Sequence, residues 1–379
     1  MSEQRYWIWL AECDKLGAVN ARKLLEHFGS AKAVYEAKSN EYMEISGFGL
    51  KSVKGLLNKR LDGADEILKN CNKIGCKVIT QNDACYPHRL KNIHDPPVVL
   101  YVLGELPQID EMPVFGIVGT RVCTPYGITH ATRAGEQLSE CGFVVVTGLA
   151  RGIDTAATLG ALEGGTPTVG VVGCGIDYVY PPENTKLYDD VASFGAVISE
   201  YPPGTVPSRA TFPMRNRIIS GLSVGVAVIE SPFRSGALIT AARALEQGRD
   251  VFALPGNVDA EKCEGSNSLL REGAIPFLTP ENIIDEYADM FSDKLKSENK
   301  STNKGGKAKA DYLDRGKLFR ELSGDEKAVA EALIKAPLLT DEIIIATRLP
   351  AQSVLTALTM LELSGFIRRD ISGRYNLVS

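Results

Sequence analysis

The stretch Phe212-Pro-Met-Arg-Asn-Arg-Ile-Ile-Ser-Gly-Leu-Ser-Val-Gly-Val-Ala-Val-Ile229 decides how the centre of this chain folds. A helix is predicted in its first half, and the apolar run Val224–Ile229 is typical of a buried strand. Arg215, Asn216 and Arg217 are bunched before this junction. A guanidinium is planar, always charged, and binds phosphate through two parallel hydrogen bonds. We therefore expect these side chains to bind an anion, unless they form structural ion pairs on a solvated helix face.

The same alternation of apolar runs and helical stretches extends over residues 113–290. The predicted strands are Val114–Val118, Phe143–Thr147, Thr168–Val172, Ala196–Ser199, Val224–Ile229, Asp250–Leu254 and Ala274–Leu278. The predicted helices are Gly127–Cys141, Asp154–Glu163, Glu183–Ala192, Pro213–Gly221, Gly236–Gln247 and Ser266–Glu272. Continuous apolar strands with helical crossovers predict an α/β fold with a doubly wound, parallel sheet. Such sheets bind ligands at the carboxyl ends of their strands.

Four glycine-containing loops follow predicted strands and should meet at that edge: Gly116–Arg121, Thr147–Asp154, Gly173–Asp177 and Glu230–Thr240. Glycine permits close backbone approach, and free amide groups at a helix N-terminus attract anions. Such turns also need glycine for geometry alone, but four converging loops favour a phosphate-binding crevice. The residues predicted to line it are Gly119, Thr120, Arg121, Thr147, Gly148, Arg151, Arg215, Asn216, Arg217, Ser235 and Gly236.

No catalytic constellation accompanies these loops. Three of the four histidines precede the sheet, no metal-ligand spacing occurs, and the chain lacks Gly-x-x-x-x-Gly-Lys-Ser/Thr. No acidic residue closes the second strand to bind a dinucleotide ribose. Asp154 is expected to cap the following helix, and Glu230 either to bind a base or sugar or to orient Arg217. We therefore expect a binding protein rather than an enzyme, with no cofactor and no metal.

The composition sets outer limits on the class of protein. The chain has 379 residues, of which 44% are hydrophobic and 23% charged, so two or three soluble domains are expected. The net charge of −5 means that any anion site must be a local concentration of positive charge. The eight cysteines are scattered, and neither a signal peptide nor an apolar membrane span is visible. These features predict a cytoplasmic protein with reduced thiols and no membrane contact.

Four segments are predicted. They are an N-terminal helical domain over 1–85, the sheet domain over 86–290, a basic flexible linker over 291–322 and a winged-helix domain over 323–379. The N-terminal domain contains Gly47-Phe48-Gly49, a turn typical of a helix-hairpin-helix or SAM-like fold, whose amides could hold a DNA phosphate. A purely structural helical bundle is the alternative.

The last two segments differ in charge. Residues 292–320 carry nine Lys and Arg against four Asp and Glu, which favours a flexible spacer over an accessory phosphate contact. The C-terminal helices are predicted at Asp325–Lys335, Asp341–Arg348 and Gln352–Leu363, followed by a ribbon. The third helix, which would read DNA, contains no Lys or Arg, whereas Arg368, Arg369 and Arg374 lie on the ribbon. A protein-contact or regulatory module is therefore favoured over a duplex reader.

Several motifs together resemble the DNA processing protein A family, called DprA or Smf. They are Gly119–Arg121, Gly148–Asp154, Tyr180–Asn184, Ile198–Gly204, Phe212–Ser223, Arg234–Ala241, Gly248–Gly256 and Gly265–Asn267. The resemblance implies a Rossmann-like domain that binds single-stranded DNA without sequence preference. It also implies protection of incoming DNA during natural transformation, loading of the RecA recombinase, and a homodimer formed through the sheet domain.

The resemblance also suggests individual contacts. It implies that Arg121 contacts DNA, and it places a second basic contact in the stretch of Lys186. Thr158 stands where the family usually has a histidine, so a role for that histidine is not expected here. Candidates for stacking on bases are the aromatic residues Tyr126, Phe212 and Phe233.

Two other functions stay open at this point. A phosphoribohydrolase acting on nucleoside monophosphates would share the overall fold, but it should show Pro-Gly-Gly-x-Gly-Thr, and this chain has only Pro202-Pro-Gly-Thr205. A winged-helix regulator with a nucleotide-sensing sheet would need a recognition helix with cations, which the third C-terminal helix lacks.

Overall fold

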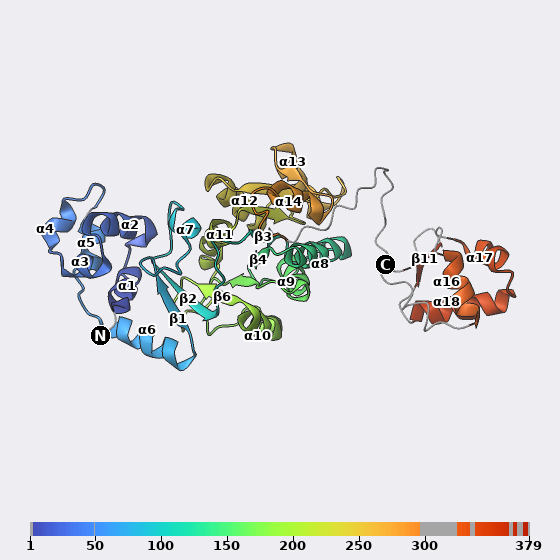
Figure 1. Cartoon of the computed structure of the whole chain (residues 1–379), viewed down its shortest axis with the longest axis horizontal. Coiled ribbons are helices and arrows are strands. Elements are labelled where there is room, and N and C mark those ends of the chain that lie inside the picture. Colours follow the sequence, from blue (N-terminus) through green and yellow to red (C-terminus); the bar gives the residue numbers. More distant parts are fainter. Residues whose placement is uncertain are drawn as a thin grey trace. The chain divides into compact units, whose positions relative to one another are not determined.

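The computed structural model of the chain describes residues 3–48, 50–295, 324–333, 338–363, 367–369 and 374–377. The chain forms two compact units, residues 1–300 and 301–379 (Figure 1). The predicted linker lies outside the described residues from 296 to 322, as does Gly49 of the predicted helix-hairpin-helix turn.

Short helices form the N-terminal part of the first unit. They are α1 (Gln4–Ala11), α2 (Gly17–Phe28), α3 (Ala31–Glu36), α4 (Ser39–Met43), α5 (Leu50–Leu56) and α6 (Asp62–Lys73). α2 ends at Gly29, which adopts a left-handed conformation with φ of 80° that closes the last helical turn. The apolar faces of these helices share one core with Val78 and Tyr101 of the neighbouring strands. The helices and the sheet therefore belong to one folded unit.

The described residues of the first unit include a nine-stranded sheet. Its strands are β1 (Lys77–Thr80), β2 (Val99–Gly104), β3 (Val114–Val118), β4 (Val144–Thr147), β5 (Val169–Val171), β6 (Ala196–Ser199), β7 (Gly225–Val228), β8 (Asp250–Ala253) and β9 (Ile275–Pro276). Their order is β1-β2-β6-β5-β4-β3-β7-β8-β9. β3 to β9 run parallel, and β2 is antiparallel to β1 and β6. The predicted α/β fold with a doubly wound, mostly parallel sheet is confirmed.

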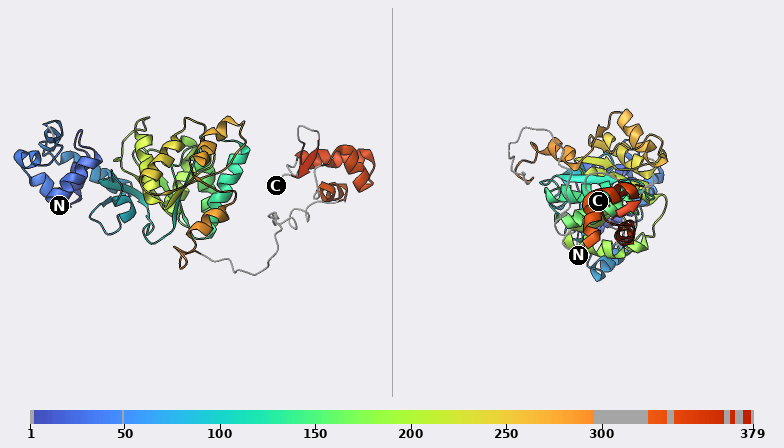
Figure 2. Two further views of the ribbon diagram at one scale, coloured as in Figure 1. Left: turned by 90° about the horizontal axis from the view of Figure 1, so that it is seen from above. Right: turned by 90° about the vertical axis from the view of Figure 1, so that its right-hand side faces the viewer.

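Helices cover both faces of this sheet (Figure 2). They are α7 (His88–Lys91), α8 (Pro125–Glu140), α9 (Ile153–Gly164), α10 (Thr185–Phe194), α11 (Thr211–Leu222), α12 (Gly236–Glu246), α13 (Glu264–Arg271) and α14 (Pro280–Tyr287). α8, α9 and α14 pack on the face that Phe115 and Val145 share, and α11 and α12 pack on the face of Val114 and Val144. Successive strand residues therefore meet different helices, as the two-residue period of a strand requires.

The sheet extends further than the apolar alternation predicts. β2 was not predicted as a strand, and it pairs with β6, which is almost a hundred residues away along the chain. The predicted domain boundary between residues 85 and 86 separates β1 from β2, which are neighbours in the sheet. The pairing of β1 with β2 therefore joins the end of the predicted N-terminal domain to the sheet. β9 is shorter than predicted and ends at Pro276, which cannot donate a ladder hydrogen bond.

The order of the strands creates a switch point between β3 and β7. From β3 the chain moves outward through β4 and β5 to β6, and α11 then returns it to β7 on the other side of β3. The loops that follow β3 and β7 consequently lead to helices on opposite faces of the sheet. Open α/β sheets form a crevice at such a point, outside the carboxyl ends of the strands.

The described residues of the second unit form three helices and a two-stranded ribbon, as the winged-helix prediction requires. Its elements are α16 (Gly324–Leu333), α17 (Thr340–Thr347), α18 (Ala351–Leu363), β10 (Ile367–Arg369) and β11 (Tyr375–Leu377). They enclose a core that includes Val329, Ile343 and Leu358. No single helix of the described residues has the length and apolar character needed to cross a membrane. α17 and α18 satisfy both criteria only as a pair bent by 115°.

Candidate functional site

A hollow of about 480 Å³ opens at the switch point, and we call it the strand-end cleft. Its walls come from the loop after β3, the loop after β7, the first turns of α11 and α12, and Asp154 of α9. The predicted residues that line it are Gly119, Thr120, Arg121, Arg215, Asn216, Ser235 and Gly236. The structure therefore brings together residues that lie more than a hundred positions apart in the sequence.

The loop after β3 carries Arg121 into the cleft. The backbone N–H of Thr120 donates to the carbonyl of Glu230 over 2.7 Å, and the carbonyl of Thr120 accepts from the N–H of Ile153 over 3.2 Å. Ile153 packs so closely on Gly119 that any side chain there would clash. This crowding explains why glycine precedes Thr120 and Arg121, and it leaves the backbone of the loop little freedom.

Arg121 lies on the ring of Phe212, with its guanidinium carbon 5.1 Å from the ring centroid. The Phe212 ring in turn lies 5.5 Å from the ring of Tyr180. Arg121 is exposed, and both rings are half-buried. A cation above an aromatic ring is held by the quadrupole of the ring while its hydrogen-bond donors stay free. Positive charge and aromatic surface therefore adjoin at the mouth of the cleft.

Two further arginines, Arg209 and Arg234, line the cleft and were not among the predicted residues. Both are exposed, and within the described part of the chain neither makes an ion pair or a side-chain hydrogen bond. Arg234 lies inside a loop that the sequence singles out, so its charge was a usable signal. Arg209 precedes α11 in a segment without helical or strand periodicity. Only its position three residues before Phe212 in the sequence indicates that it lies near the cleft.

Arg215 is buried at the base of the cleft, where it joins two strand ends. One of its terminal nitrogens donates to the carbonyl of Gly148, over 2.7 Å, and to the carbonyl of Val171. Its Nε donates to the side-chain oxygen of Asn216 over 3.2 Å. Burial lowers the pKa of Arg215 to about 10, so it stays protonated at neutral pH. Arg215 thus adds positive charge to the cleft while it fixes the loops after β4 and β5.

Asp154 is the acidic residue of the cleft. It was expected to cap α9, but Gly152 occupies the cap position, and the Asp154 carboxylate accepts from the N–H groups of Gly148 and Ala150 at 3.0 and 3.4 Å. It therefore holds the preceding loop, in which Leu149 adopts a left-handed φ of 50°. Burial raises the pKa of Asp154 to about 6, and the charge of Arg215 opposes that rise.

The raised pKa of Asp154 predicts a pH-dependent affinity of the cleft for anions. The carboxyl becomes neutral as the pH falls through about 6, so anion binding should strengthen by a factor of about 2–10 between pH 7.5 and 5.5. The contribution of the Asp154 carboxyl to the free energy of unfolding changes with pH in the same direction as the affinity. A carboxyl whose pKa is raised by folding stabilises the folded state at low pH, and this stabilisation is lost as the pH rises. An Asp154→Asn variant should bind at pH 7.5 as tightly as the unchanged protein does at pH 5.5.

The measurement is a binding curve for a labelled anionic oligonucleotide at several pH values for both proteins. The variant leaves every other titratable side chain of the protein unchanged, so it isolates the part of the pH dependence that Asp154 causes. A pH dependence that persists in Asp154→Asn would show that other groups cause it.

Arg217 does not reach the cleft, which corrects the prediction that it binds phosphate. Its side chain is only 2% exposed and forms ion pairs with Asp95 at 3.1 Å and Glu200 at 2.6 Å. The alternative in which Glu230 orients Arg217 is not realised either, because the Glu230 carboxylate binds Thr124 instead. Arg217 therefore belongs to the packing between α11, the segment before β2 and the end of β6.

The remaining predicted residues lie around the cleft. Thr147 is buried, and its hydroxyl hydrogen-bonds that of Thr158 over 2.8 Å, so Thr158 fills a packing position. Arg151 is exposed and pairs with Glu183. Lys186 is exposed on α10 and does not line the cleft. Ser235 caps α12, its hydroxyl accepting from the N–H of Ala237 over 3.2 Å.

Of the other stacking candidates, Tyr126 is tied to the loop after β8. Its hydroxyl donates to the carbonyl of Pro255 over 2.7 Å, and its ring centroid lies 4.3 Å from that of His130. Phe233 is 63% exposed in the loop after β7. Among the described residues, no group of three His, Cys, Asp or Glu side chains could hold a metal ion.

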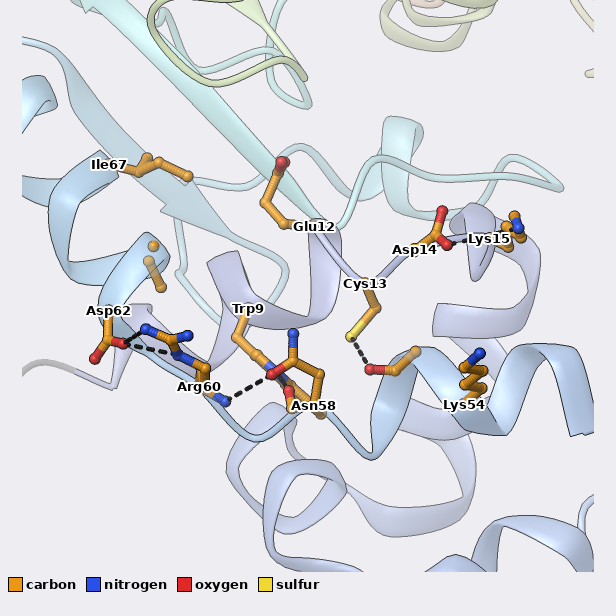
Figure 3. Close-up of a pocket in the computed structure, with 13 residues that line it drawn as sticks. Trp9, Glu12, Cys13, Asp14, Lys15, Lys54, Asn58, Arg60, Asp62 and Ile67 are labelled. Atoms are coloured by element: carbon orange, nitrogen blue, oxygen red, sulfur yellow. Dashed lines mark hydrogen bonds and ion pairs between the residues drawn. The ribbon is translucent and has the colours of Figure 1, made fainter.

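A larger hollow, of about 750 Å³, lies among the N-terminal helices but has a different character (Figure 3). Its charges largely compensate one another, since Arg60 pairs with Asp62 at 2.8 Å and Lys15 lies 3.8 Å from Asp14. The indole of Trp9 donates to the carbonyl of Asn58 over 2.7 Å. Mixed, paired charges give this hollow no preference for anions, in contrast to the strand-end cleft.

Comparison with protein families gives two matches. A family described as DNA recombination-mediator protein A matches residues 77–288, and a family described as the DprA winged helix domain matches residues 319–370. Protein Smf of Synechocystis sp. is 33% identical to this chain, covering 99% of the chain and 98% of the relative. DNA processing protein DprA of Streptococcus pneumoniae is 42% identical over 54% of this chain and 72% of its own length.

Two solved structures are similar to the chain. The X-ray structure of DprA from Streptococcus pneumoniae has a TM-score of 0.66 and 34% identity, covering 74% of this chain and 97% of that protein. A structure concerned with the single-stranded DNA binding mode of DprA from Helicobacter pylori has a TM-score of 0.52 and 30% identity. It covers 56% of this chain and 97% of that protein.

Proposed function

Because this chain belongs to the DNA recombination-mediator protein A family, also called DprA or Smf, we propose that it binds single-stranded DNA without sequence preference in the strand-end cleft. The observation that carries the proposal is the set of three exposed arginines, Arg121, Arg209 and Arg234, around one hollow. Within the described residues these cations make no ion pair, so they are available to phosphates.

The aromatic surface beside these arginines favours a single strand over a duplex. Phe212 lines the cleft, Tyr180 lies beside Phe212, and Arg121 covers one face of the Phe212 ring. Unpaired bases expose faces that stack on aromatic rings, whereas the bases of a duplex are already stacked. Stacking is tolerant of sequence because every base has such a face. Arginines that can contact the DNA backbone, placed beside two aromatic rings, therefore suit a flexible unpaired strand.

The proposal extends to the biological role. DNA processing in recombination is the role that membership in the family gives the chain. We propose further that the protein protects incoming DNA during natural transformation, loads the RecA recombinase onto it, and acts as a homodimer without enzymatic turnover. The second unit would then contact proteins rather than duplex DNA, since α18 carries no Lys or Arg.

The test is fluorescence anisotropy of a labelled oligo-dT over a salt series, with an unlabelled duplex as competitor. Each phosphate contact on a single strand contributes about −0.7 to the slope of log affinity against log salt. Three contacts predict a slope of about −2, and the duplex should compete poorly. No binding at low salt, or equal competition by the duplex, would contradict the proposal. Release of free base from AMP would instead support a phosphoribohydrolase.

A further inference from the structure

We infer that Glu230 is a positioning residue that holds the loop carrying Arg121 in its DNA-binding position. The inference rests on the proposed function, since it concerns the same cleft. Glu230 lies two residues beyond the end of β7, is 1% exposed and does not line the cleft. It therefore acts on DNA only through the residues that it holds.

Glu230 grips both ends of the loop between β3 and α8. Its backbone carbonyl accepts from the N–H of Thr120 over 2.7 Å. Its carboxylate accepts from the N–H of Thr124 over 2.9 Å and from the hydroxyl of Thr124 over 2.5 Å. Arg121 lies between these two anchor points. The loop after β3 is thereby tied to the end of β7, across the switch point that forms the cleft.

The carboxylate also meets the N-terminus of α8, which begins at Pro125 after the cap residue Thr124. The Thr124 hydroxyl accepts from the N–H of Gly127 over 3.3 Å while it donates to Glu230. A carboxylate at a helix N-terminus is stabilised by the helix dipole. The Glu230 carboxylate therefore lies at the N-terminus of α8, where it fixes the start of the helix relative to the loop that carries Arg121.

Gly127 shows how closely the carboxylate is fitted. A methyl group added at Gly127 would overlap the Glu230 carboxylate and approach Ile153. Gly127 has ordinary helical backbone angles, so glycine is not needed there for its conformational freedom. It is needed because a side chain would occupy the space of the Glu230 carboxylate. A Gly127→Ala variant therefore displaces the Glu230 carboxylate without changing any charge.

Positioning and charge make opposite predictions for Glu230. As a negative charge near the cleft, Glu230 repels phosphates, so its removal would by itself strengthen DNA binding. As a positioning residue, it keeps Arg121 in place, so its removal frees the loop and raises the cost of ordering it on binding. A loss of affinity on removing this negative charge would therefore report positioning.

The experiment compares Gly127→Ala and Glu230→Ala in the full chain, using oligo-dT anisotropy over a salt series. Both variants should weaken binding by about three- to tenfold and make the salt slope shallower by about 0.7, the share of one phosphate contact. In an Arg121→Ala background neither variant should weaken binding further. Gly63→Ala is the matched control, since an added methyl there meets no atom within 4 Å.

Three results would overturn the inference. They are unchanged or tighter binding in both variants, losses that add fully to that of Arg121→Ala, or an unaltered salt slope. Thermal unfolding identifies a variant that does not fold, and Thr124→Val, which removes only the hydroxyl link, then takes its place with the same expectation. If the unchanged protein does not bind oligo-dT, the proposed function fails. If the unchanged protein binds oligo-dT and both variants bind it with the same affinity and salt slope, the proposed function stands and only the inference about Glu230 fails.

Discussion

Replacing Arg121, Arg209 and Arg234 together by alanine is expected to weaken binding of single-stranded DNA by about two orders of magnitude or more at 0.1 M salt. A charge-assisted contact to phosphate at an exposed site contributes about 1 kcal/mol, and three such contacts are lost. The salt slope should become shallower by about 2. The fold should stay intact, because these side chains are exposed and make no ion pair in the described structure. Oligo-dT anisotropy over a salt series measures both quantities.

The control for this prediction removes the same charge elsewhere. Lys32, Lys73 and Arg243 are solvent-accessible residues on α3, α6 and α12 that do not line the cleft. Their triple alanine variant has the same net charge as the cleft variant. If both variants lose affinity equally, the cleft has no special part in binding and only total charge matters.

Arg217→Ala should destabilise the protein by about 3–5 kcal/mol, because it leaves two carboxylates with low exposure, Asp95 and Glu200, without their cation. The urea midpoint or the melting temperature should fall accordingly, and folded protein should be scarce. Burial already raises the pKa of Glu200 although Arg217 lies against it, so removing Arg217 should raise this pKa further. Chemical unfolding followed by circular dichroism measures the change in the free energy of unfolding.

An exposed ion pair provides the comparison for Arg217. Arg243 pairs with Glu246 at 2.7 Å with both side chains at least 40% exposed, so Arg243→Ala should cost less than about 1 kcal/mol. Combining Arg217→Met with Asp95→Asn and Glu200→Gln should recover part of the stability, since no buried charge is then left unpaired. A stable Arg217→Ala protein with weakened DNA binding would return Arg217 to the binding surface.

The contrast between Arg215 and Arg217 illustrates the limit of prediction from sequence. Both follow Phe212 in one helix, and two residues turn about 200° around a helix axis, so they must point in nearly opposite directions. The sequence does not tell which of them faces the cleft. The partner that decides it, Asp95, lies more than a hundred residues earlier and becomes a neighbour only in the folded chain.

The cleft itself was predictable because of a rule about parallel sheets. Apolar strands with helical crossovers place the loops after Val118 and Val228 at one edge, and the glycines and arginines in these loops then point to an anion site. Arg209 and the grip of Glu230 on Thr124 were not predictable. They depend on the conformation of a loop and on the fit of one carboxylate against Gly127. The periodic spacing of apolar residues, which reveals helices and strands, gives no information on either.

The most direct test of the account is photocrosslinking of the full chain to oligonucleotides that contain 5-iodouracil, followed by mass spectrometry of the crosslinked peptides. Crosslinks are expected foremost at Phe212 of the strand-end cleft and at the adjoining Tyr180, and they should be lost when unlabelled oligo-dT is added in excess. Crosslinks confined to the N-terminal helices or to residues 324–377, with none in the loops of the cleft, would contradict it.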